Sequence, residues 1–368
     1  MKKIRLCCIG GGTNSSVGRV HFSSSGLDNL FEIVCGSFSR NKEINKKTGK
    51  YLNLSSSKIY NNWKHLLKNE ANNIDAILLI TPNESHFKIL IEALKYNKPI
   101  VCEKPITMNN IESKKLLKLK NASKYILPIF NYTGYPILRE LKFNLNRIGK
   151  INNINIRMPQ QSYALINKIK NLKKFSLQKW KFNKTIIPMI CLDLGVHMEN
   201  LVYFILNKKP SMVFGNFNRS KSTYTDVKII SKYGQTEVFY WFSKKSLGHD
   251  NSLEINIFGE KGSFIWKQDD CENLIFTDNY GKKNIINRGM DCREASKIRY
   301  NRFKIGHPIG FIEAFANYYY DIYYSIKSKK RNKFVFNLKD ALDGINFFET
   351  AFNSHKKKTW LKIKNIIK

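Results

Sequence analysis

The stretch IRLCCIGGGTNSSVG, residues 4–18, places an apolar run directly before three glycines and a polar turn. Residues 4–9 predict a buried β-strand, and residues 17–27 predict a helix. A glycine-rich turn between a strand and a helix is where a dinucleotide pyrophosphate binds, because glycine allows close approach to the backbone and the helix N-terminal amides face the anion. The spacing is G-x-G-x5-G, longer than the usual G-x-G-x-x-G. The stretch therefore predicts a dinucleotide-binding βαβ unit.

The first third of the chain repeats this alternation of strand and helix. We expect further strands at residues 31–36, 76–80, 100–102 and 127–130, and helices at residues 60–67, 85–95 and 110–120. Residues 76–80 (AILLI) are continuously apolar, as strands buried in parallel sheets are. Asn109 and Glu112 are spaced as a capping pair for the last of these helices. Repeated βαβ units predict an α/β fold with a right-handed, doubly wound parallel sheet.

Beyond about residue 128 the pattern changes to strands that follow one another directly. We expect these strands at residues 151–158, 211–218, 227–233, 237–243, 253–258 and 263–266. YGQT at 233–236 and GEKG at 259–262 read as hairpin turns. Alternating apolar residues at 253, 255 and 257 indicate an antiparallel sheet with one covered face, and helices return at 311–326 and 338–352. We therefore divide the chain into a dinucleotide-binding domain at 1–128 and a second α+β domain at 129–368, with the C-terminal helices able to pack back on the first.

Length, composition and charge indicate how many domains the chain has and which kinds of partner it could bind. The chain has 368 residues, of which 42% are hydrophobic, enough for two cores. Its formal net charge of +35 would suit a polyanion partner. However, the lysines are spread along the chain and Asn and Ile are also abundant, so we favour a compositional bias, with clusters only at 327–333 and 356–358. We expect no nucleic-acid partner.

Membrane, metal and disulfide classes are also disfavoured. No apolar run approaches the roughly 18–20 residues of a membrane span, and the apolar stretch at the N-terminus is too short for a signal peptide. The seven cysteines form no C-x-x-C pair. Cys7, Cys8, Cys35 and Cys102 lie in strand-like runs, which indicates reduced, buried thiols in a cytoplasmic protein.

The predicted strand ends carry the candidate functional residues. TPNESH (81–86) follows one strand and Glu103-Lys104-Pro105 follows the next. Ligands of open α/β sheets bind at the carboxyl ends of the strands, so Lys104 is expected in the cofactor cleft. The second strand ends in GSFSR (36–40) without the acid that binds an NAD ribose. Arg40 there favours NADP over NAD, unless Arg40 is merely solvated.

A second cluster, CLDLGVHMEN at 191–200, pairs an acid with a histidine. If this segment is helical, Asp193 and His197 are four residues apart and share a face. A lone buried histidine is more often a core residue. Together with the acid one turn away, and with a lysine at a cleft, the catalytic interpretation becomes the better one.

At this point the chain resembles the glucose–fructose oxidoreductase / inositol dehydrogenase (Gfo/Idh/MocA) family of nicotinamide-dependent sugar dehydrogenases. The resemblance covers nearly the full length. It is carried in order by the glycine loop, TPNESH, EKP, FNYTGYP (130–136), DLGVH (193–197), GHDNSLEINIFGEKGS (248–263) and GHPIGFIEAFANYYYDI (306–322). It implies a Rossmann domain followed by an α+β domain whose large, mostly antiparallel open sheet often mediates oligomerisation.

The resemblance also implies roles for individual residues. Lys104 would lie between nicotinamide and substrate and orient the reacting hydroxyl, His197 would be the general acid/base, and Asp193 would orient His197 or hold the sugar. Histidine suits this step because it titrates near neutrality. The expected cofactor-binding residues are Gly10, Gly12, Thr13, Asn14, Ser39, Arg40, Thr81, Pro82, Asn83, His86, Glu103, Lys104 and Asn131. For His86, a structural role at the start of a helix is an equal alternative.

Two departures from the family pattern concern the substrate pocket. Many relatives have several glycines before the D-x-G-x-H segment, whereas this chain has IIPMI at 186–190. Trp180-Lys181 stands where relatives often have Trp-Arg, which weakens a bidentate anion contact. Possible substrate contacts, with ordinary packing as the alternative, are Gln160, Gln161, Tyr163 and Trp180.

The sequence thus predicts a cytoplasmic NAD(P)-dependent oxidoreductase that acts on a secondary alcohol or ketone of a sugar, a cyclitol or a derivative. Alternatives are a redox-neutral sugar conversion with tightly held cofactor and a non-catalytic dinucleotide sensor. We also expect a homodimer or homotetramer, because Val238, Tyr240 and Phe242 form an aromatic-rich row on one strand face. The competing account is that this row is the domain's own core, with Glu237 and Ser243 facing water.

Overall fold

The computed structural model describes residues 2–168 and 185–366. They form two compact units, which we describe separately. The first comprises residues Met1–Gly134 and Phe311–Leu342, and the second comprises Tyr135–Gly310 and Asp343–Lys368.

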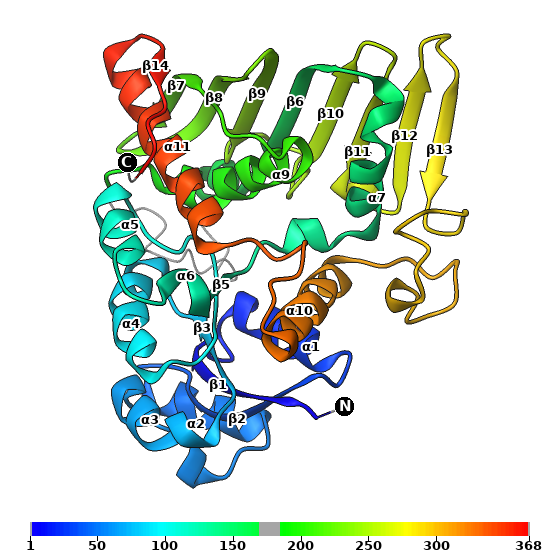
Figure 1. Ribbon diagram of the computed structural model, residues 1–368. Helices are drawn as coiled ribbons and strands as arrows, with labels where there is room; N and C mark the ends of the chain where they lie inside the picture. Colours follow the sequence, from blue (N-terminus) through cyan, green and yellow to red (C-terminus); the bar gives the residue numbers. More distant parts are fainter. Residues whose placement is uncertain (1, 169–184, 367–368) are drawn as a thin grey trace. The chain divides into compact units, whose positions relative to one another are not determined.

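The first unit contains a five-stranded parallel sheet in the order β2-β1-β3-β4-β5 (Figure 1). Its strands are β1 (Ile4–Gly10), β2 (Phe31–Ser37), β3 (Ala76–Ile80), β4 (Ile100–Cys102) and β5 (Ile126–Pro128). Its helices are α1 (Ser16–Gly26), α2 (Lys42–Tyr51), α3 (Trp63–Glu70), α4 (His86–Ala93), α5 (Asn110–Leu117), α6 (Ala122–Tyr125) and α10 (Phe311–Ser328). The strand order reverses beside β1, so the predicted doubly wound Rossmann sheet is confirmed, with its switch point at the carboxyl ends of β1 and β3.

Local signals placed most of these elements correctly. The backbone N–H of Glu112 donates to Asn109 Oδ1 over 3.0 Å, and that of Met108 donates to Glu112 Oε2 over 2.8 Å, which is the expected capping pair. The helix expected at 60–67 begins instead at Trp63, because the Asn62 side chain accepts the N–H of Lys64 and caps it there. Helix α2 was not predicted; its buried residues are Asn45, Thr48 and Gly49, which give no apolar stripe.

The α10 helix comes from late in the sequence yet packs in the first unit, alongside α1 (Figure 1). Close packing is required at Gly134, where an added Cβ would lie 1.9 Å from the carbonyl oxygen of Ala314 in α10. The Asn317 side chain donates to the carbonyl of Gly134 over 2.9 Å, and the Tyr318 hydroxyl donates to that of Pro128 over 2.9 Å. These contacts fix α10 to the end of β5.

The second unit contains a nine-stranded sheet in the order β13-β12-β11-β10-β6-β9-β8-β7-β14. Its strands are β6 (Ile151–Pro159), β7 (Met212–Ser220), β8 (Thr223–Tyr233), β9 (Thr236–Ser243), β10 (Glu254–Gly259), β11 (Gly262–Lys267), β12 (Asn273–Asp278), β13 (Lys283–Asn287) and β14 (Leu361–Lys362). Among the strands described for this sheet, only β6 and β9 pair in parallel, so the predicted large, mostly antiparallel sheet is confirmed. Both predicted hairpins are present, since Tyr233 pairs with Thr236 and Gly259 with Gly262.

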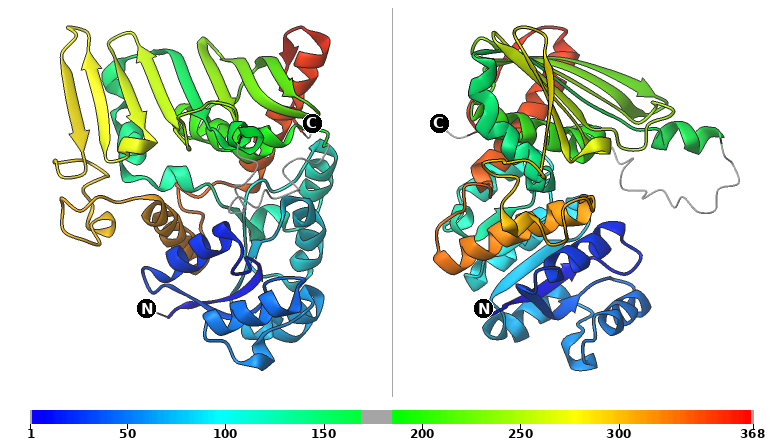
Figure 2. Two further views of the ribbon diagram at one scale, coloured as in Figure 1. Left: turned by 180° about the vertical axis from the view of Figure 1, so that it is seen from behind. Right: turned by 90° about the vertical axis from the view of Figure 1, so that its right-hand side faces the viewer.

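Helices cover one face of this sheet, as the two views of Figure 2 show. The helices of this part are α7 (Pro136–Asn144), α8 (Ser162–Lys168), α9 (Val196–Leu206) and α11 (Leu338–Lys357). In α11, Phe347 packs 5.4 Å from Tyr240 and Phe348 lies 6.1 Å from Phe242, measured between ring centroids. Our expectation that Val238, Tyr240 and Phe242 form an intermolecular face is therefore wrong: all three are buried in this unit's own core. Ser243 is buried too.

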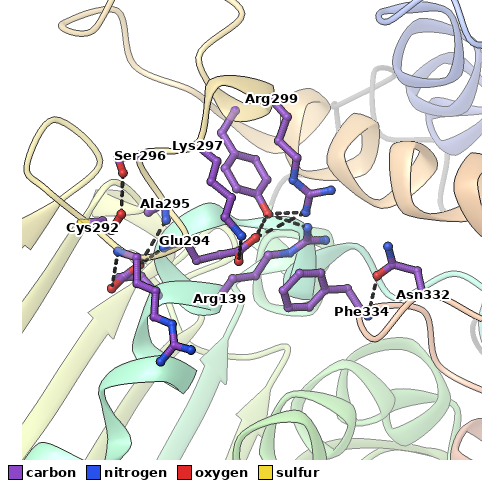
Figure 3. Close-up of polar contacts among 12 residues, drawn as sticks. Arg139, Cys292, Glu294, Ala295, Ser296, Lys297, Arg299, Asn332 and Phe334 are labelled. Carbon is purple, nitrogen blue, oxygen red and sulfur yellow. Dashed lines mark hydrogen bonds and ion pairs between the residues drawn. The ribbon is translucent and has the colours of Figure 1, made fainter.

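A buried polar cluster fixes the segment that follows β13 to α7 (Figure 3). Arg139 is fully buried and donates to the Tyr300 hydroxyl over 2.9 Å, and that hydroxyl donates to Glu294 Oε1 over 2.7 Å. Beside it, Glu140 Oε2 accepts the backbone N–H groups of Glu294 and Ala295. This cluster was not predicted, because its members are about 150 residues apart in the sequence.

Candidate active site

The glycine loop brings the backbone of β1 against the end of β3. Gly10 and Gly11 have φ angles of +92° and +77°, which favour glycine. An added Cβ on Gly10 would lie 2.6 Å from the Ile80 carbonyl oxygen, and one on Gly18 would lie 2.4 Å from the Gly11 carbonyl oxygen. Side chains are therefore excluded at the switch point, because the loop backbone packs directly against the end of β3 and the start of α1.

Internal hydrogen bonds hold the loop before helix α1. The Gly12 N–H donates to the Phe38 carbonyl over 3.1 Å, and the Thr13 N–H donates to Thr48 Oγ1 over 2.9 Å. Ser15 caps α1 by accepting the Gly18 N–H. Of the predicted residues here, Thr13 is thus engaged through its backbone, while Asn14 is exposed. An eleven-residue helix with a serine cap presents its positive N-terminal end next to the loop.

The end of β2 carries Ser39 and Arg40. The Ser39 hydroxyl accepts the N–H of Asn41, which caps α2, and the Arg40 side chain is exposed. An exposed cation at this strand end can meet an added 2′-phosphate.

The end of β3 forms a tight turn into α4. The Ser85 hydroxyl donates to Thr81 Oγ1 over 2.8 Å, while Pro82 and Asn83 complete the turn. His86 is fully buried, with Nδ1 2.8 Å from the Pro105 carbonyl oxygen and Nε2 2.9 Å from the Thr81 carbonyl oxygen. Burial lowers the pKa of His86, although both carbonyls favour its charged form. With both nitrogens engaged by the backbone, the structural role of His86 is the one these contacts support.

The end of β4 carries Glu103 and Lys104. Glu103 Oε1 lies 2.9 Å from His21 Nε2 of α1, and Glu103 Oε2 accepts the Lys104 backbone N–H over 3.0 Å. Burial alone would raise the pKa of Glu103, but the hydrogen bond from His21 and the charge of Lys104 outweigh it and lower that pKa. Glu103 is therefore a carboxylate whose two oxygens are engaged by the protein. His21 was not predicted from the sequence.

Asn131 follows the end of β5 and offers a test of whether a dinucleotide fits this unit. The side chain is 1% exposed, and its amide nitrogen has no hydrogen-bond partner among residues 2–168 and 185–366. A buried, unpaired donor is costly unless a ligand satisfies it. Together with the side-chain-free loop at Gly10 and Gly11, this donor fits a bound dinucleotide.

The second unit carries Asp193 and His197. Residues Cys191–Gly195 form a single π-helical turn that leads into α9. Of the ten residues 191–200, only Asp193 and His197 are partly exposed; the other eight are buried. Gly195 lies between them, and its added Cβ would be 2.6 Å from Phe348 Cζ. The π turn and this glycine place the acid and the base at an accessible surface of an otherwise buried segment.

Lys244 is a site residue that sequence analysis missed. It follows β9, and its Nζ donates to Asp193 Oδ2 over 2.6 Å, with both side chains only 13–14% exposed. The pair is separated by 51 residues, and in the sequence Lys244 is one of many lysines. No local signal distinguished it.

The proposed substrate contacts lie near Lys244. The backbone N–H of Tyr163 donates to the Lys244 carbonyl over 2.8 Å, and that of Gln160 donates to the Ser243 carbonyl over 2.7 Å. The side chain of Gln160 is engaged with Asn251, and that of Gln161 with Asp250. Trp180 lies outside the described residues.

The described residues also bear on metal sites and membrane spans. No group of three or more His, Cys, Asp or Glu side chains among them could hold a metal ion. None of the helices described is long and apolar enough to cross a membrane. Cys7, Cys8, Cys35 and Cys102 are all buried free thiols, as expected.

Both units match models of one protein family. The model of the oxidoreductase family with an NAD-binding Rossmann fold (Gfo/Idh/MocA) matches residues 4–129, and the model of that family's C-terminal α/β domain matches residues 144–363. An uncharacterized oxidoreductase of Bacillus subtilis, YfiI, is 24% identical over 99% of this chain and 98% of its own length.

Two solved structures are similar over nearly the whole chain. An oxidoreductase from Sinorhizobium meliloti has a TM-score of 0.84 and 26% identity, covering 98% of this chain and 100% of its own. An inositol dehydrogenase homolog from Azotobacter vinelandii, complexed with NADH and myo-inositol, has a TM-score of 0.88 and 21% identity, covering 98% of both chains. At 21% identity, the similarity to the Azotobacter vinelandii structure shows that the two chains share a fold. Because the two family models together match most of the chain, it belongs to the Gfo/Idh/MocA family of NAD(P)-dependent oxidoreductases.

Proposed function

We propose that the chain oxidises a secondary alcohol of a sugar, a cyclitol or a derivative, or reduces the corresponding ketone. The observation that carries this proposal is the accessible pair Asp193 and His197 in a segment whose other eight residues are buried. Burial of an imidazole is ordinary in a core. A partly exposed imidazole four residues from an acid, which is itself paired with Lys244, suits proton transfer to a bound ligand better than packing.

Each residue has a distinct task in the oxidation. When bound, the nicotinamide supplies the hydride acceptor. The C–H electron pair leaves the carbinol carbon as hydride, the carbon becomes a carbonyl, and His197 takes the hydroxyl proton. Lys104 holds the reacting oxygen through its ammonium group. Asp193 remains an anion beside Lys244 and orients the imidazole or a sugar hydroxyl.

We further propose that NADP is the preferred cofactor. The segment 37–41 contains no acid to hold a ribose 2′-hydroxyl, and Arg40 is exposed at that strand end. Neutral hydroxyl-rich substrates are proposed because the substrate-side residues Asp193 and Lys244 neutralise each other.

The test is a panel of sugars, cyclitols and their ketones with NAD and NADP, followed by the absorbance of reduced nicotinamide. We expect turnover with at least one member of the panel, faster with NADP. If the panel gives no redox change while nucleotide stays bound through native purification, as seen by mass spectrometry, a redox-neutral conversion replaces this proposal. If no nucleotide binds at all, the enzymatic assignment fails.

A further inference from the structure

A chain of three buried side chains lies behind Lys104 in the first unit. The Tyr319 hydroxyl of α10 is 2.7 Å from His21 Nδ1 of α1, and His21 Nε2 is 2.9 Å from Glu103 Oε1 at the end of β4. Tyr319, His21 and Glu103 are 2%, 0% and 9% exposed. None of them has a task in the chemical step proposed above.

The direction of the hydrogen bonds follows from the chemistry of the groups. A carboxylate can only accept, so His21 Nε2 carries the proton and donates to Glu103. Burial raises the pKa of Tyr319 well above its ordinary value, so its hydroxyl stays protonated where it lies 2.7 Å from His21 Nδ1. With Nε2 protonated, the imidazole satisfies both contacts, because the Tyr319 hydroxyl can either donate to Nδ1 or accept from it.

The second oxygen of Glu103 is directed at Lys104. Glu103 Oε2 accepts the Lys104 backbone N–H over 3.0 Å, which fixes the first peptide of the turn. On the other side of Lys104, His86 lies 2.8 Å from the carbonyl oxygen of Pro105. The backbone that carries Lys104 is thus held on both sides by buried side chains.

The same chain joins three elements that are distant in sequence. Helix α1 begins at the glycine loop, β4 ends at Lys104, and α10 comes from residues 311–328. His21 also packs edge-on against Phe315 of α10, with ring centroids 5.1 Å apart. His21 therefore connects α1, which begins at the glycine loop, with the turn that carries Lys104.

We propose that His21 and Tyr319 are positioning residues, which hold the Glu103 carboxylate against Lys104 so that the lysine keeps both its backbone geometry and its charge. This inference rests on the proposed function in one respect, namely that Lys104 takes part in the reaction. It adds the reason why an acid precedes that lysine: Glu103 serves Lys104 directly, rather than the nucleotide.

The charged and titratable groups around Glu103 come from every element that packs on it. They are His21 of α1, Cys102 of β4, Lys104 of the turn, His86 of α4 and Tyr319 of α10. Among these, the hydrogen bond and charge of His21 and the charges of Lys104 and His86 lower the pKa of Glu103 against the effect of burial. By reciprocity, the Glu103 carboxylate stabilises the ammonium form of Lys104.

The decisive experiment measures Lys104 without any substrate. The full-length protein is acetylated with a limiting amount of acetic anhydride over a range of pH, and the labelling of the Lys104 peptide is read by mass spectrometry. In Glu103→Gln, the pKa of Lys104 should fall, so that labelling below that pKa rises about three- to tenfold. The exposed Glu32→Gln is the control for charge removal at a distance, and the Lys98 peptide is the internal standard. An unchanged Lys104 profile in Glu103→Gln overturns the proposal, whether or not a substrate has been found.

Two variants of His21 separate positioning from packing. His21→Gln keeps an amide donor for Glu103, whereas His21→Leu keeps the volume and removes the donor. If His21 only fills space, the leucine variant is at least as active as the glutamine variant. We expect the opposite: kcat falls at least tenfold in His21→Leu and recovers in His21→Gln, with KM for cofactor little changed. Tyr319→Phe, which keeps the ring, should lower kcat less than His21→Leu does. Equal kcat values for His21→Leu and His21→Gln would contradict the proposal.

Discussion

At the scale of single residues, the pair formed by Asp193 and Lys244 sets the electrostatics of the candidate site. The ammonium and carboxylate are 2.6 Å apart with little exposure, so water screens them weakly. Such a pair holds the Asp193 side chain in place. In the proposed reaction, Asp193 would then be the orienting group, and His197 would be the group that exchanges the proton.

We predict that Lys244→Ala lowers kcat/KM by about 10²-fold, because an unpaired Asp193 side chain moves and misplaces the groups it orients. The matched control is Lys245→Ala, which removes the neighbouring cation and should leave kcat/KM within about twofold. Steady-state kinetics on a substrate from the panel provides the measurement. Similar losses in both variants would show that the effect is only one of net charge.

His197→Ala and Lys104→Ala should each lower kcat by roughly 10²–10⁴-fold, the usual contribution of a positioned acid or base. Their circular dichroism and nucleotide binding should stay close to those of the wild type, since both side chains are only partly buried. Nucleotide titration by fluorescence separates binding from turnover. Wild-type kcat in either variant would remove that residue from the mechanism.

Arg40→Ala should weaken NADP binding by about 1–3 kcal/mol and leave NAD binding nearly unchanged, because a hydrogen bond to a charged phosphate is lost. Lys50→Ala, an exposed cation in the last turn of α2, is the control. The measurement is the dissociation constant of NAD and of NADP for the wild type and for each variant. Equal losses for NAD and NADP would exclude a role for Arg40 in choosing between them.

At the scale of elements, the π turn before α9 depends on close packing at one glycine. Gly195 faces Phe348 of α11 and Phe242 of β9, with no space for a methyl group. The helix that carries His197 therefore lies directly on the sheet and on α11. The position of the base is set by a core contact rather than by the surface.

Gly195→Ala should destabilise the protein by about 1–3 kcal/mol, the usual range for overpacking a core. Gly26→Ala is a matched control, because nothing lies within 4 Å of its added Cβ, and it should be neutral or stabilise by up to about 1 kcal/mol. Urea unfolding followed by circular dichroism measures both. A Gly195→Ala midpoint at or above that of the wild type would contradict the packing seen here.

At the scale of the whole molecule, the described helices cover one face of the nine-stranded sheet and leave the other face uncovered. Phe239 of β9 and Phe258 of β10 are 36% and 40% exposed, and Trp241 shares the face of Phe239 by the two-residue period. These side chains, and not the buried row Val238, Tyr240 and Phe242, are the apolar groups that a second copy of the chain could cover.

We predict a homodimer or homotetramer at micromolar concentration and moderate salt, with an interface above roughly 2,000 Å². Repulsion from the +35 charge is screened beyond about 8–10 Å under those conditions. Light scattering should give at least twice 43.0 kDa. Phe239→Glu should shift the mass towards the monomer, whereas Val17→Glu, exposed on α1 of the other unit, should not. A wild-type mass near 43.0 kDa would exclude the assembly.

The sequence by itself determined the fold class and indicated the candidate functional segments. Strands, caps and hairpin turns depend on neighbours a few residues away, so Ala76–Ile80, Asn109 with Glu112, and the turn at Gly234 could be predicted. The glycine loop could be predicted as well, because glycine is the residue that fits where φ is positive and where two backbone segments approach closely. Lys104 and the pair Asp193 and His197 were located by spacing and by family resemblance.

Only the tertiary structure decided which distant groups meet. Strand β9 reads VFYWF and carries large apolar residues on both faces, so its alternation could not show that α11 covers Tyr240 and leaves Phe239 exposed. The partners of Asp193 and Glu103, namely Lys244 and His21, lie 51 and 82 residues away. Such pairs form because separate elements pack together, and a local pattern carries no information about the element that will pack against it.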